Sequence, residues 1–398
     1  MSSFNQSGAG ERRHSKRVLL LLAMSLAVVA MALAACGSSD SSSDNNSSGG
    51  GGGSTDVSGF QAKLEKYQQT TPAEWSGPTE PVKNVPKDLK VAGVTCFSQL
   101  EGCLSPIVGA EHAAKDLGWS FDTYDGEGDP TVQAKRIQQA ISNGADAIIT
   151  SAINGDLISS ELAQAKKKGI LVISTSNGTG PGEQGFRLDT SPNLIEIGRG
   201  VGAWMAADSD GKAVVQPFLD NEFVSNIQFD KGIQAELAEC GSCEVKKTVD
   251  FVGTDVASNL GPNTVQTLQE NPDVNYFYST YDPAMAAQVA AVAQAGLDVQ
   301  SCSQLGNAQN LNFIKEGNIQ ACDGAWDNEY EGYATIDQIA RIAGGQDPWV
   351  TEGVPARFKY GENIPYALID KSNLPAGDEA FHADYDYVSE YHKLWGLE

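Results

Sequence analysis

Short apolar segments alternate with longer amphipathic segments from about residue 88 onward. Strands are expected at the first four apolar runs, residues 89–94, 120–124, 147–150 and 171–173. Helices are expected between them, at residues 107–117, 130–143 and 157–168. A glycine follows each of these helical segments, as is common at helix ends. Strands that alternate with helices predict a parallel sheet covered on both faces.

The same alternation repeats after a connecting helix expected at residues 192–207. Further strands are expected at residues 212–216, 245–251, 274–278 and 299–304, and further helices at residues 225–239, 260–270 and 283–295. The expected fold class is therefore α/β, with two similar doubly wound parallel-sheet lobes in series. Ligands bind beyond the carboxyl ends of the strands in such sheets, so two facing lobes predict an interlobe cleft that closes by a hinge.

The N-terminus has the order of an export signal, with basic residues, an apolar run at residues 18–31 and small residues before Cys36. The run is short for a membrane-spanning helix. Residues 33–36 resemble the bacterial lipobox, which implies that residues 1–35 are a lipoprotein signal peptide and that Cys36 is lipidated. An ordinary signal peptide or an anchor helix remains the alternative. Residues 36–87 are expected to be a Gly/Ser-rich spacer followed by an extended lead-in that packs on the domain surface.

The charge of the chain limits its partners. The formal net charge is -24 over 398 residues, and without residues 1–35, which hold four basic groups and one acidic group, about -27 remains. Nucleic-acid binding needs a basic footprint, so nucleic acid is not an expected partner. The length left after the signal and spacer suits two lobes of about 150 residues each.

The cysteines also indicate an exported protein. Six of the seven remain after Cys36 is set aside, and they form close neighbours in sequence: Cys96 and Cys103, Cys240 and Cys243, Cys302 and Cys322. Three local disulfides are the favoured interpretation, although six cysteines allow 15 pairings. A zinc or redox site at residues 240–243 is the alternative, but zinc needs two more ligands and the three histidines beyond residue 35 lie far off in sequence, so no metal or cofactor is expected.

Several short segments together carry a resemblance to a known family. They are residues 90–94 (KVAGV), 117–119 (LGW), 143–149 (NGADAII), 168–173 (KGILVI) and 271–278 (NPDVNYFY), followed by Asp282 and Met285-Ala286. In this order and spacing they resemble the type I periplasmic binding proteins of the ribose-binding kind, which deliver solutes to ABC importers. The resemblance covers residues 87–397. Repressors that share this fold carry a DNA-binding headpiece, where this chain has the lipobox and spacer.

The resemblance implies three crossings between the lobes, near residues 188–189, 325–326 and 364–365. The N-terminal lobe would then comprise residues 88–189 and 327–362. The C-terminal lobe would comprise residues 190–326 and 363–398.

The binding site is expected in loops at the carboxyl ends of the strands. Aromatic side chains can cover the apolar face of a ring, and short polar side chains can bind hydroxyl or amide groups. The candidate ligand-binding residues are Phe97, Asn177, Asp220, Tyr281, Asp282, Asn307 and Trp326.

Some of these candidates have a structural alternative. Phe97 could belong to the core, Asp282 could cap the following helix, and Asn307 could be a turn residue. Ribose-type binders carry an acidic-arginine pair and a further arginine, where this chain has Ser176-Asn177 and Phe229-Asp230-Lys231. We therefore expect a ligand that is less densely hydroxylated, or larger and flatter, than a simple pentose.

These observations predict an extracytoplasmic, lipid-anchored monomer on the outer face of the bacterial cytoplasmic membrane. It would capture a small polar solute, a sugar or sugar-like compound, and deliver it to an ABC transporter permease. A lipoprotein that reports to a membrane sensor and a binder of an aromatic or nucleoside-like solute remain alternatives. The sequence contains no nucleophile elbow, metalloprotease motif or phosphate loop, so an enzyme is not expected.

Overall fold

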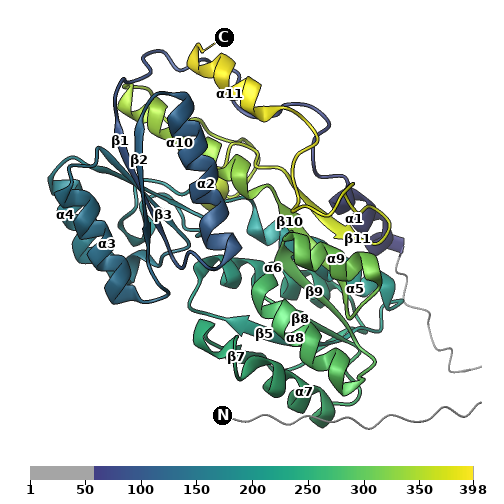
Figure 1. The fold of residues 1–398 in the computed structure, drawn as a ribbon. Helices are drawn as coiled ribbons and strands as arrows, with labels where there is room; N and C mark the ends of the chain where they lie inside the picture. The colour runs from purple at the N-terminus through teal and green to yellow at the C-terminus, as the bar shows by residue number, and fades with distance from the viewer. Residues whose placement is uncertain (1–57, 398) are drawn as a thin grey trace, which may run out of the picture. The chain divides into compact units, whose positions relative to one another are not determined.

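The computed structural model describes residues 58–397, which form two sheets with helices on both faces of each (Figure 1). The expected signal peptide, Cys36 and the Gly/Ser-rich spacer lie outside the described residues, whereas the lead-in lies within them from Ser58 onward. The first sheet has four parallel strands in the order β2-β1-β3-β4. Their bounds are β1 Lys90–Thr95, β2 Ser120–Asp125, β3 Ala147–Ser151 and β4 Leu171–Thr175.

Helices cover both faces of the first sheet because its central strands are apolar on both sides. Every residue of β3 is buried. The covering helices are α2 Glu101–Asp116 and α10 Asn328–Ala343 on one face, and α3 Pro130–Ser142 and α4 Ser159–Lys167 on the other (Figure 1). The sequence sets the ends of α3 locally: Asp129 caps it by accepting from the Thr131 N–H, Pro130 starts it, and Gly144 follows with φ of 77°.

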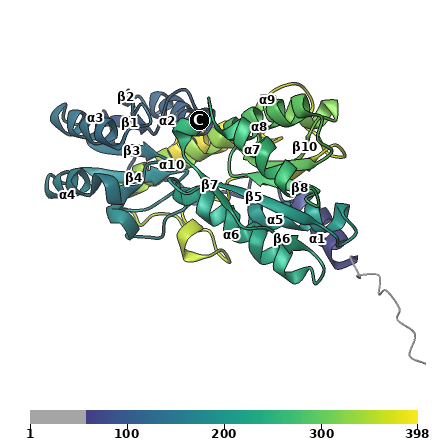
Figure 2. The ribbon, with the colours of Figure 1, turned by 90° about the horizontal axis from the view of Figure 1, so that it is seen from below.

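The second sheet has the order β11-β10-β9-β8-β5-β6, with β7 also paired to β5. All pairs are parallel except the β10–β11 pair, which is antiparallel. The strands are β5 Val214–Asp220, β6 Glu244–Val245, β7 Val249–Phe251, β8 Tyr276–Ser279, β9 Gln300–Leu305, β10 Gln320–Trp326 and β11 Tyr366–Asp370. Its helices are α5 Leu194–Asp208, α6 Val224–Glu239, α7 Leu260–Glu270, α8 Asp282–Ala295 and α9 Ala308–Glu316. Figure 2 shows α5 and α6 on one face and α7 and α8 on the other.

Between β4 and β11 the chain passes between the two sheets three times. It leaves the first sheet after Asp189 for α5, returns at Asp327 to α10, and enters the second sheet again at β11. The last helix, α11 Tyr387–Trp395, packs on α10 through rings such as Tyr391 and Tyr330. The C-terminal helix therefore lies beside the first sheet's helices, whereas the predicted boundaries placed it in the second lobe. The lobe boundaries themselves stay predictions.

The predicted α/β fold class is confirmed, but several elements differ from their predictions. The helix expected at residues 107–117 begins at Glu101, with Pro106 inside it. The strand expected at residues 245–251 is interrupted between Val245 and Val249. The sequence analysis also did not predict α9, β10, α10, β11 and α11.

The lead-in is the clearest correction. Residues 58–68 form the helix α1 Ser58–Gln68 instead of an extended segment. Phe60 and Tyr67 are buried, and Leu64 packs beside them, so the apolar side chains recur at the i, i+4, i+7 spacing of one helix face. This face contacts α5 and β11, which accounts for a helix in a segment that is otherwise polar.

Candidate functional site

A pocket lies between the carboxyl ends of the two sheets, where the sequence predicted the site. Its walls come from the start of α2, from the strand ends of both sheets and from the start of α6. The lining residues are Leu100, Gly102, Cys103, Ala152, Ser176, Phe223, Ser225, Asn226, Tyr281, Pro283, Gln304, Leu305 and Trp326. We call this the inner pocket, and its volume is about 50 Å³.

A second pocket of about 480 Å³ continues from the first. The two share Leu100, Ala152, Phe223 and Tyr281. This outer pocket adds Phe97, Glu127 and Glu222, among others. The outer pocket is lined by two glutamates, Glu127 and Glu222, and neither pocket is lined by a lysine or an arginine. The combined site therefore suits an uncharged or cationic ligand better than an anion.

Three residues that line the inner pocket have backbone conformations that are uncommon for residues with a side chain. They are Ala152 with φ of 52°, Ser176 with φ of 53° and Leu305 with φ of 129°. Each follows or ends a strand, β3, β4 or β9. Positive φ costs energy for non-glycine residues and clusters at functional sites. These residues indicate that the strand ends around the inner pocket are held by the surrounding structure.

Two opposite walls of the inner pocket approach each other closely at Gly102. A Cβ atom added there would lie 2.8 Å from Leu305 Cδ1. Gly102 in α2 therefore packs directly against the Leu305 side chain at the end of β9, and a side chain at residue 102 would require Leu305 to shift. This contact closes one side of the inner pocket.

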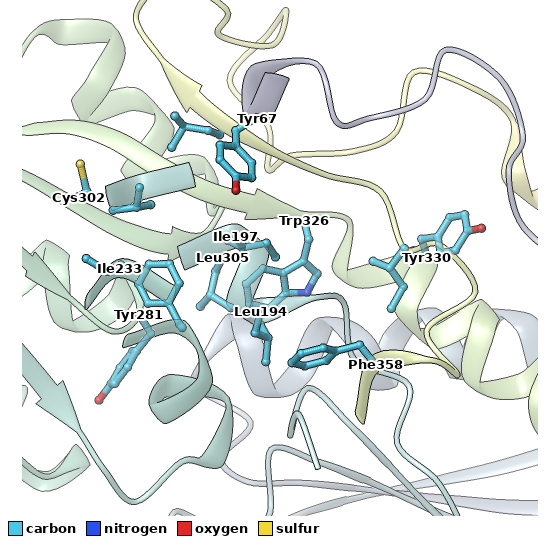
Figure 3. Close-up of a cluster of buried hydrophobic side chains, with 14 of the residues drawn as sticks. Tyr67, Leu194, Ile197, Ile233, Tyr281, Cys302, Leu305, Trp326, Tyr330 and Phe358 are labelled. Carbon is cyan, nitrogen blue, oxygen red and sulfur yellow. The ribbon is translucent and has the colours of Figure 1, made fainter. Parts of the chain in front are cut away.

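Trp326 ends β10 and lines the inner pocket. Its side chain is 1% exposed, and its Nε1 donates to Glu331 Oε2 over 3.1 Å. Figure 3 shows Trp326 in the buried cluster that also holds Leu194, Leu305 and Phe358. One edge of the indole is thus fixed by packing and a hydrogen bond, while the ring borders the pocket.

Tyr281 lines both pockets and packs against the rings of Phe223 and Phe251, each with a centroid separation of 6.0 Å. Its hydroxyl points away from the buried cluster in Figure 3 and donates to Asp220 Oδ2 over 3.1 Å. Burial raises the pKa of Asp220 to about 7. Asp220 lines neither pocket, so the structure places it behind Tyr281 and not at the ligand surface.

Asp282 and Asn307 form a pair behind the inner pocket. Asp282 Oδ2 accepts from the Asn307 N–H over 2.8 Å, and its other oxygen accepts from Ser303. Burial and the nearby Asp323 carboxylate raise the pKa of Asp282 well above its usual value. Both residues line neither pocket, and together they hold the loop that follows Leu305.

Asn177 and Phe97 occupy different places in the site. Asn177 is 2% exposed and donates to Ile153 O over 3.1 Å, and it lines neither pocket, although its neighbour Ser176 lines the inner one. Phe97 lines only the outer pocket. Of the seven predicted residues, the structure thus brings Tyr281 and Trp326 to the inner pocket and Phe97 to the outer one.

Gln304 is a pocket residue that the sequence analysis did not single out. It is 1% exposed, and its Nε2 donates to Thr280 O over 2.7 Å and to Asn226 Oδ1 over 3.2 Å. Asn226 Nδ2 in turn donates to Asp220 O. These acceptors fix the orientation of both amides, and Gln304 Oε1 is left without a partner at the pocket.

An unpaired buried acceptor is costly, which makes Gln304 Oε1 a candidate acceptor for a ligand donor. The sequence feature that could have identified Gln304 was its position at the end of the strand predicted at residues 299–304. The loop predicted to carry ligand contacts comprised residues 306–307, which excludes Gln304.

The cysteines form three disulfides, Cys96–Cys103, Cys240–Cys243 and Cys302–Cys322. The first joins the two pockets, since Cys96 lines the outer and Cys103 the inner one. It closes the segment that carries Phe97 and Leu100. Within residues 58–397, no group of three or more His, Cys, Asp or Glu side chains is placed to hold a metal ion. No helix between residues 58 and 397 is long and apolar enough to cross a membrane.

The two sheets, the three crossings between them and the pocket at their carboxyl ends define a solute-binding protein fold. Residues 103–347 match the family described as periplasmic binding protein domain. Because this match covers more than half of the chain, the protein belongs to that family. The likeness therefore extends from the fold to the sequence.

A curated relative and several solved structures are similar to this chain. The ribose import binding protein RbsB of Bacillus subtilis is 23% identical over 219 residues, which are 54% of this chain and 68% of that protein. An ABC sugar transporter subunit from Rhodobacter sphaeroides has a TM-score of 0.63 at 20% identity, and the match covers 71% of this chain and 99% of that one. An Agrobacterium vitis solute-binding protein with bound allitol has a TM-score of 0.65 at 17% identity, and the match covers 72% of this chain and 97% of that one.

Proposed function

We propose that this protein is an extracytoplasmic solute-binding lipoprotein that captures a sugar or sugar-like solute between its two sheets and delivers it to an ABC importer permease. One observation carries the proposal: the indole of Trp326 and Gln304, whose Oε1 is unpaired, line the same inner pocket. A ring with both a C–H face and hydroxyl donors fits this pair. The relatives named for sugar or ribose transport support the same ligand class.

The pocket volumes indicate how the ligand enters. The inner pocket, at about 50 Å³, has about a tenth of the volume of the outer pocket, at about 480 Å³, so we expect a sugar to need the space of both. The ligand would occupy the inner and outer pockets together after the lobes open. Closure would then place groups from both sheets on the ligand and stabilise the closed form.

A solute with an apolar portion is the second candidate. The inner pocket is lined by Leu100, Phe223, Leu305 and Trp326, among others, and both pockets lack lysine and arginine. A solute-binding protein from Thermotoga lettingae in complex with 5-methylthioribose has a TM-score of 0.62 at 18% identity, and the match covers 75% of this chain and 92% of that one. We therefore include that compound and nucleosides among the ligands to be tested.

A thermal-shift screen tests the proposed ligand class. The panel contains D-ribose, D-galactose, allitol, 5-methylthioribose, adenosine and the amino acids. A specific ligand at a hundredfold excess over its Kd stabilises the folded state by about 2.7 kcal/mol. Stabilisation by a sugar or polyol supports the proposal, stabilisation by 5-methylthioribose or adenosine alone supports the second candidate, and stabilisation only by amino acids contradicts both.

The membrane anchor and the transport role need separate tests. The lipobox-like segment before Cys36 supports lipidation, so C36A should release the protein from the membrane fraction. Membrane retention of C36A would contradict the anchor. A strain that lacks the protein should lose uptake of the bound solute, whereas normal uptake with altered signalling would favour the sensor alternative.

A further inference from the structure

Glu331 is a buried carboxylate that touches residues of both sheets at the base of the inner pocket. It lies in the first turns of α10 and is fully buried. Its side chain reaches the end of β4 in the first sheet and the end of β10 in the second. The carboxylate therefore sits where the chain returns from the second sheet to the first.

Four donors bind the two carboxylate oxygens. Oε1 accepts from the Thr175 hydroxyl over 2.6 Å and from the Ser176 backbone N–H. Oε2 accepts from the Ser176 hydroxyl over 3.0 Å and from Trp326 Nε1 over 3.1 Å. Ser176 and Trp326 both line the inner pocket, so a single group orients one pocket residue from each sheet.

Ser176 shows why this support matters. Its backbone has φ of 53°, in the left-handed region that favours glycine. Such a conformation is unfavourable for a residue with a side chain and persists only where neighbours hold it. Glu331 provides that support, because it accepts from both the N–H and the hydroxyl of Ser176.

We propose that Glu331 is a positioning residue of the binding site, whose carboxylate holds the Trp326 indole of the second sheet and Ser176 of the first sheet in their pocket-facing orientations. It does not line either pocket itself. It acts on the ligand through Trp326 and Ser176, so its effect on ligand affinity rests on the proposed function. Its effect on the indole does not.

The role requires a carboxylate and not an amide. A glutamine at this position would keep its oxygen toward the Ser176 N–H, which can only donate. Its NH₂ group would then face the Trp326 N–H, and two donors cannot bind each other. The Ser176 hydroxyl could rotate to accept. E331Q should therefore break the contact to Trp326 selectively while it retains the size of the side chain.

Protonation of Glu331 should also weaken the hydrogen bond that it accepts from the Trp326 N–H. Burial raises the pKa of Glu331 to about 7, and the nearby Asp189 carboxylate adds to the rise, while hydrogen bonds from Thr175 and Ser176 oppose it. Asp189 is the charged group that acts on Glu331 among the described residues. It accepts from the Gly178 and Ser191 N–H groups and from Ser174, and burial raises its pKa to about 6.

The direct test is the indole N–H resonance of Trp326 in the full chain, labelled with ¹⁵N-tryptophan. The chain has six tryptophans, and W326F assigns the relevant peak by its loss. Between pH 5 and pH 8 the Trp326 peak should move downfield with a midpoint near pH 7, as Glu331 loses its proton and becomes the better acceptor. In E331Q the peak should start displaced and not titrate with that midpoint.

D189N separates the two carboxyl groups and serves if E331Q fails to fold. The amide oxygen of the introduced asparagine can still accept from the two backbone N–H groups, while removal of the Asp189 charge should lower the midpoint of the Trp326 peak. A lowered midpoint supports the proposal. An unchanged midpoint in D189N, or an E331Q peak at the wild-type position with the wild-type titration, would overturn it.

A calorimetric titration extends the test to the ligand. E331Q should bind whichever of D-ribose, D-galactose and allitol the wild type binds, but about tenfold more weakly. Equal affinity in E331Q and wild type would overturn the positioning role. If the wild type binds none of the three, the proposed sugar function fails, and the resonance of Trp326 still decides the role of Glu331.

Discussion

The hydroxyl of Tyr281 donates a hydrogen bond to Asp220 Oδ2 over 3.1 Å, so two residues that the sequence suggested as separate ligand contacts form one unit. The ring of Tyr281 lines the pockets, and Asp220 holds the ring from behind. Asp220 also accepts from the Glu222 N–H. The Tyr281 hydroxyl is therefore one of two donors that support a buried carboxyl group.

Y281F should make the stability of the protein more sensitive to pH. The pKa of Asp220 is raised to about 7 in the folded state from 3.8, so stability attributable to Asp220 falls as the pH rises from about 4 to 7. Loss of the phenol donor makes the ionised form less favourable still. Y281F should lose about 1–2 kcal/mol, with a larger loss at pH 8 than at pH 5, measured by urea unfolding.

D220N provides the matched background for this measurement. Without the ionisable group, the cost of Y281F should be the same at both pH values. A pH-dependent cost that persists in D220N would show that another group is responsible.

Substitution of Trp326 should weaken ligand binding, and the structure determines which variant can show it. W326A removes a side chain that is 1% exposed and should cost about 3–5 kcal/mol of stability. W326F keeps most of the apolar volume and should weaken affinity for the bound sugar about tenfold in a calorimetric titration, because the ring face shrinks and the bond to Glu331 is lost. W119F is the control, since Trp119 is also buried and donates to Pro86 O over 2.8 Å but lines neither pocket.

Removal of the Cys96–Cys103 disulfide should affect affinity as well as stability. C96S/C103S frees the segment between the pockets, so ordering it on binding costs more, and affinity should fall severalfold. C240S/C243S removes a disulfide that lines neither pocket. It should lower the thermal midpoint without a change in Kd, and equal effects of both pairs on Kd would contradict a role for Cys96–Cys103 in the cleft.

The helix α1 should be part of the cooperative fold although it lies before the first strand. Tyr67 is 5% exposed and donates to Glu196 Oε2 over 3.1 Å. Y67A should therefore lower the free energy of unfolding by about 3 kcal/mol. E65A, on the exposed side of the same helix, should change it by less than about 0.5 kcal/mol. Similar small effects of both variants in a urea titration would show that α1 is not docked.

Strand and helix periodicity predicted most of the fold because apolar runs such as Ala147–Ser151 are buried on both faces. It failed where burial depends on distant partners. The apolar face formed by Phe60, Leu64 and Tyr67 is narrow, and its burial against α5 stabilises the helix. Pro106 also misled the prediction of α2, since a proline inside a helix normally marks a boundary.

The position of the candidate site at the strand ends was predicted from the sequence, but the hydrogen-bond partners of its polar side chains were not. Loops at strand ends led to Tyr281 and Trp326, which line the inner pocket because topology brings those strand ends together. Whether a polar side chain faces a ligand depends on what else it bonds, and sequence does not show that Asp282 binds the Asn307 N–H. Gln304 was not predicted for the same reason, because the sequence does not show that Thr280 and Asn226 fix its amide.

The most direct test of a sugar site at the inner pocket is a calorimetric titration of wild type and Q304L with D-ribose, D-galactose and allitol. We expect the wild type to bind at least one of these compounds with one site per chain. Q304L should bind the same compound at least tenfold more weakly, because a leucine offers no acceptor to the ligand hydroxyl. Binding of equal strength in Q304L, or no binding of any of the three by the wild type, would contradict a sugar site at this pocket.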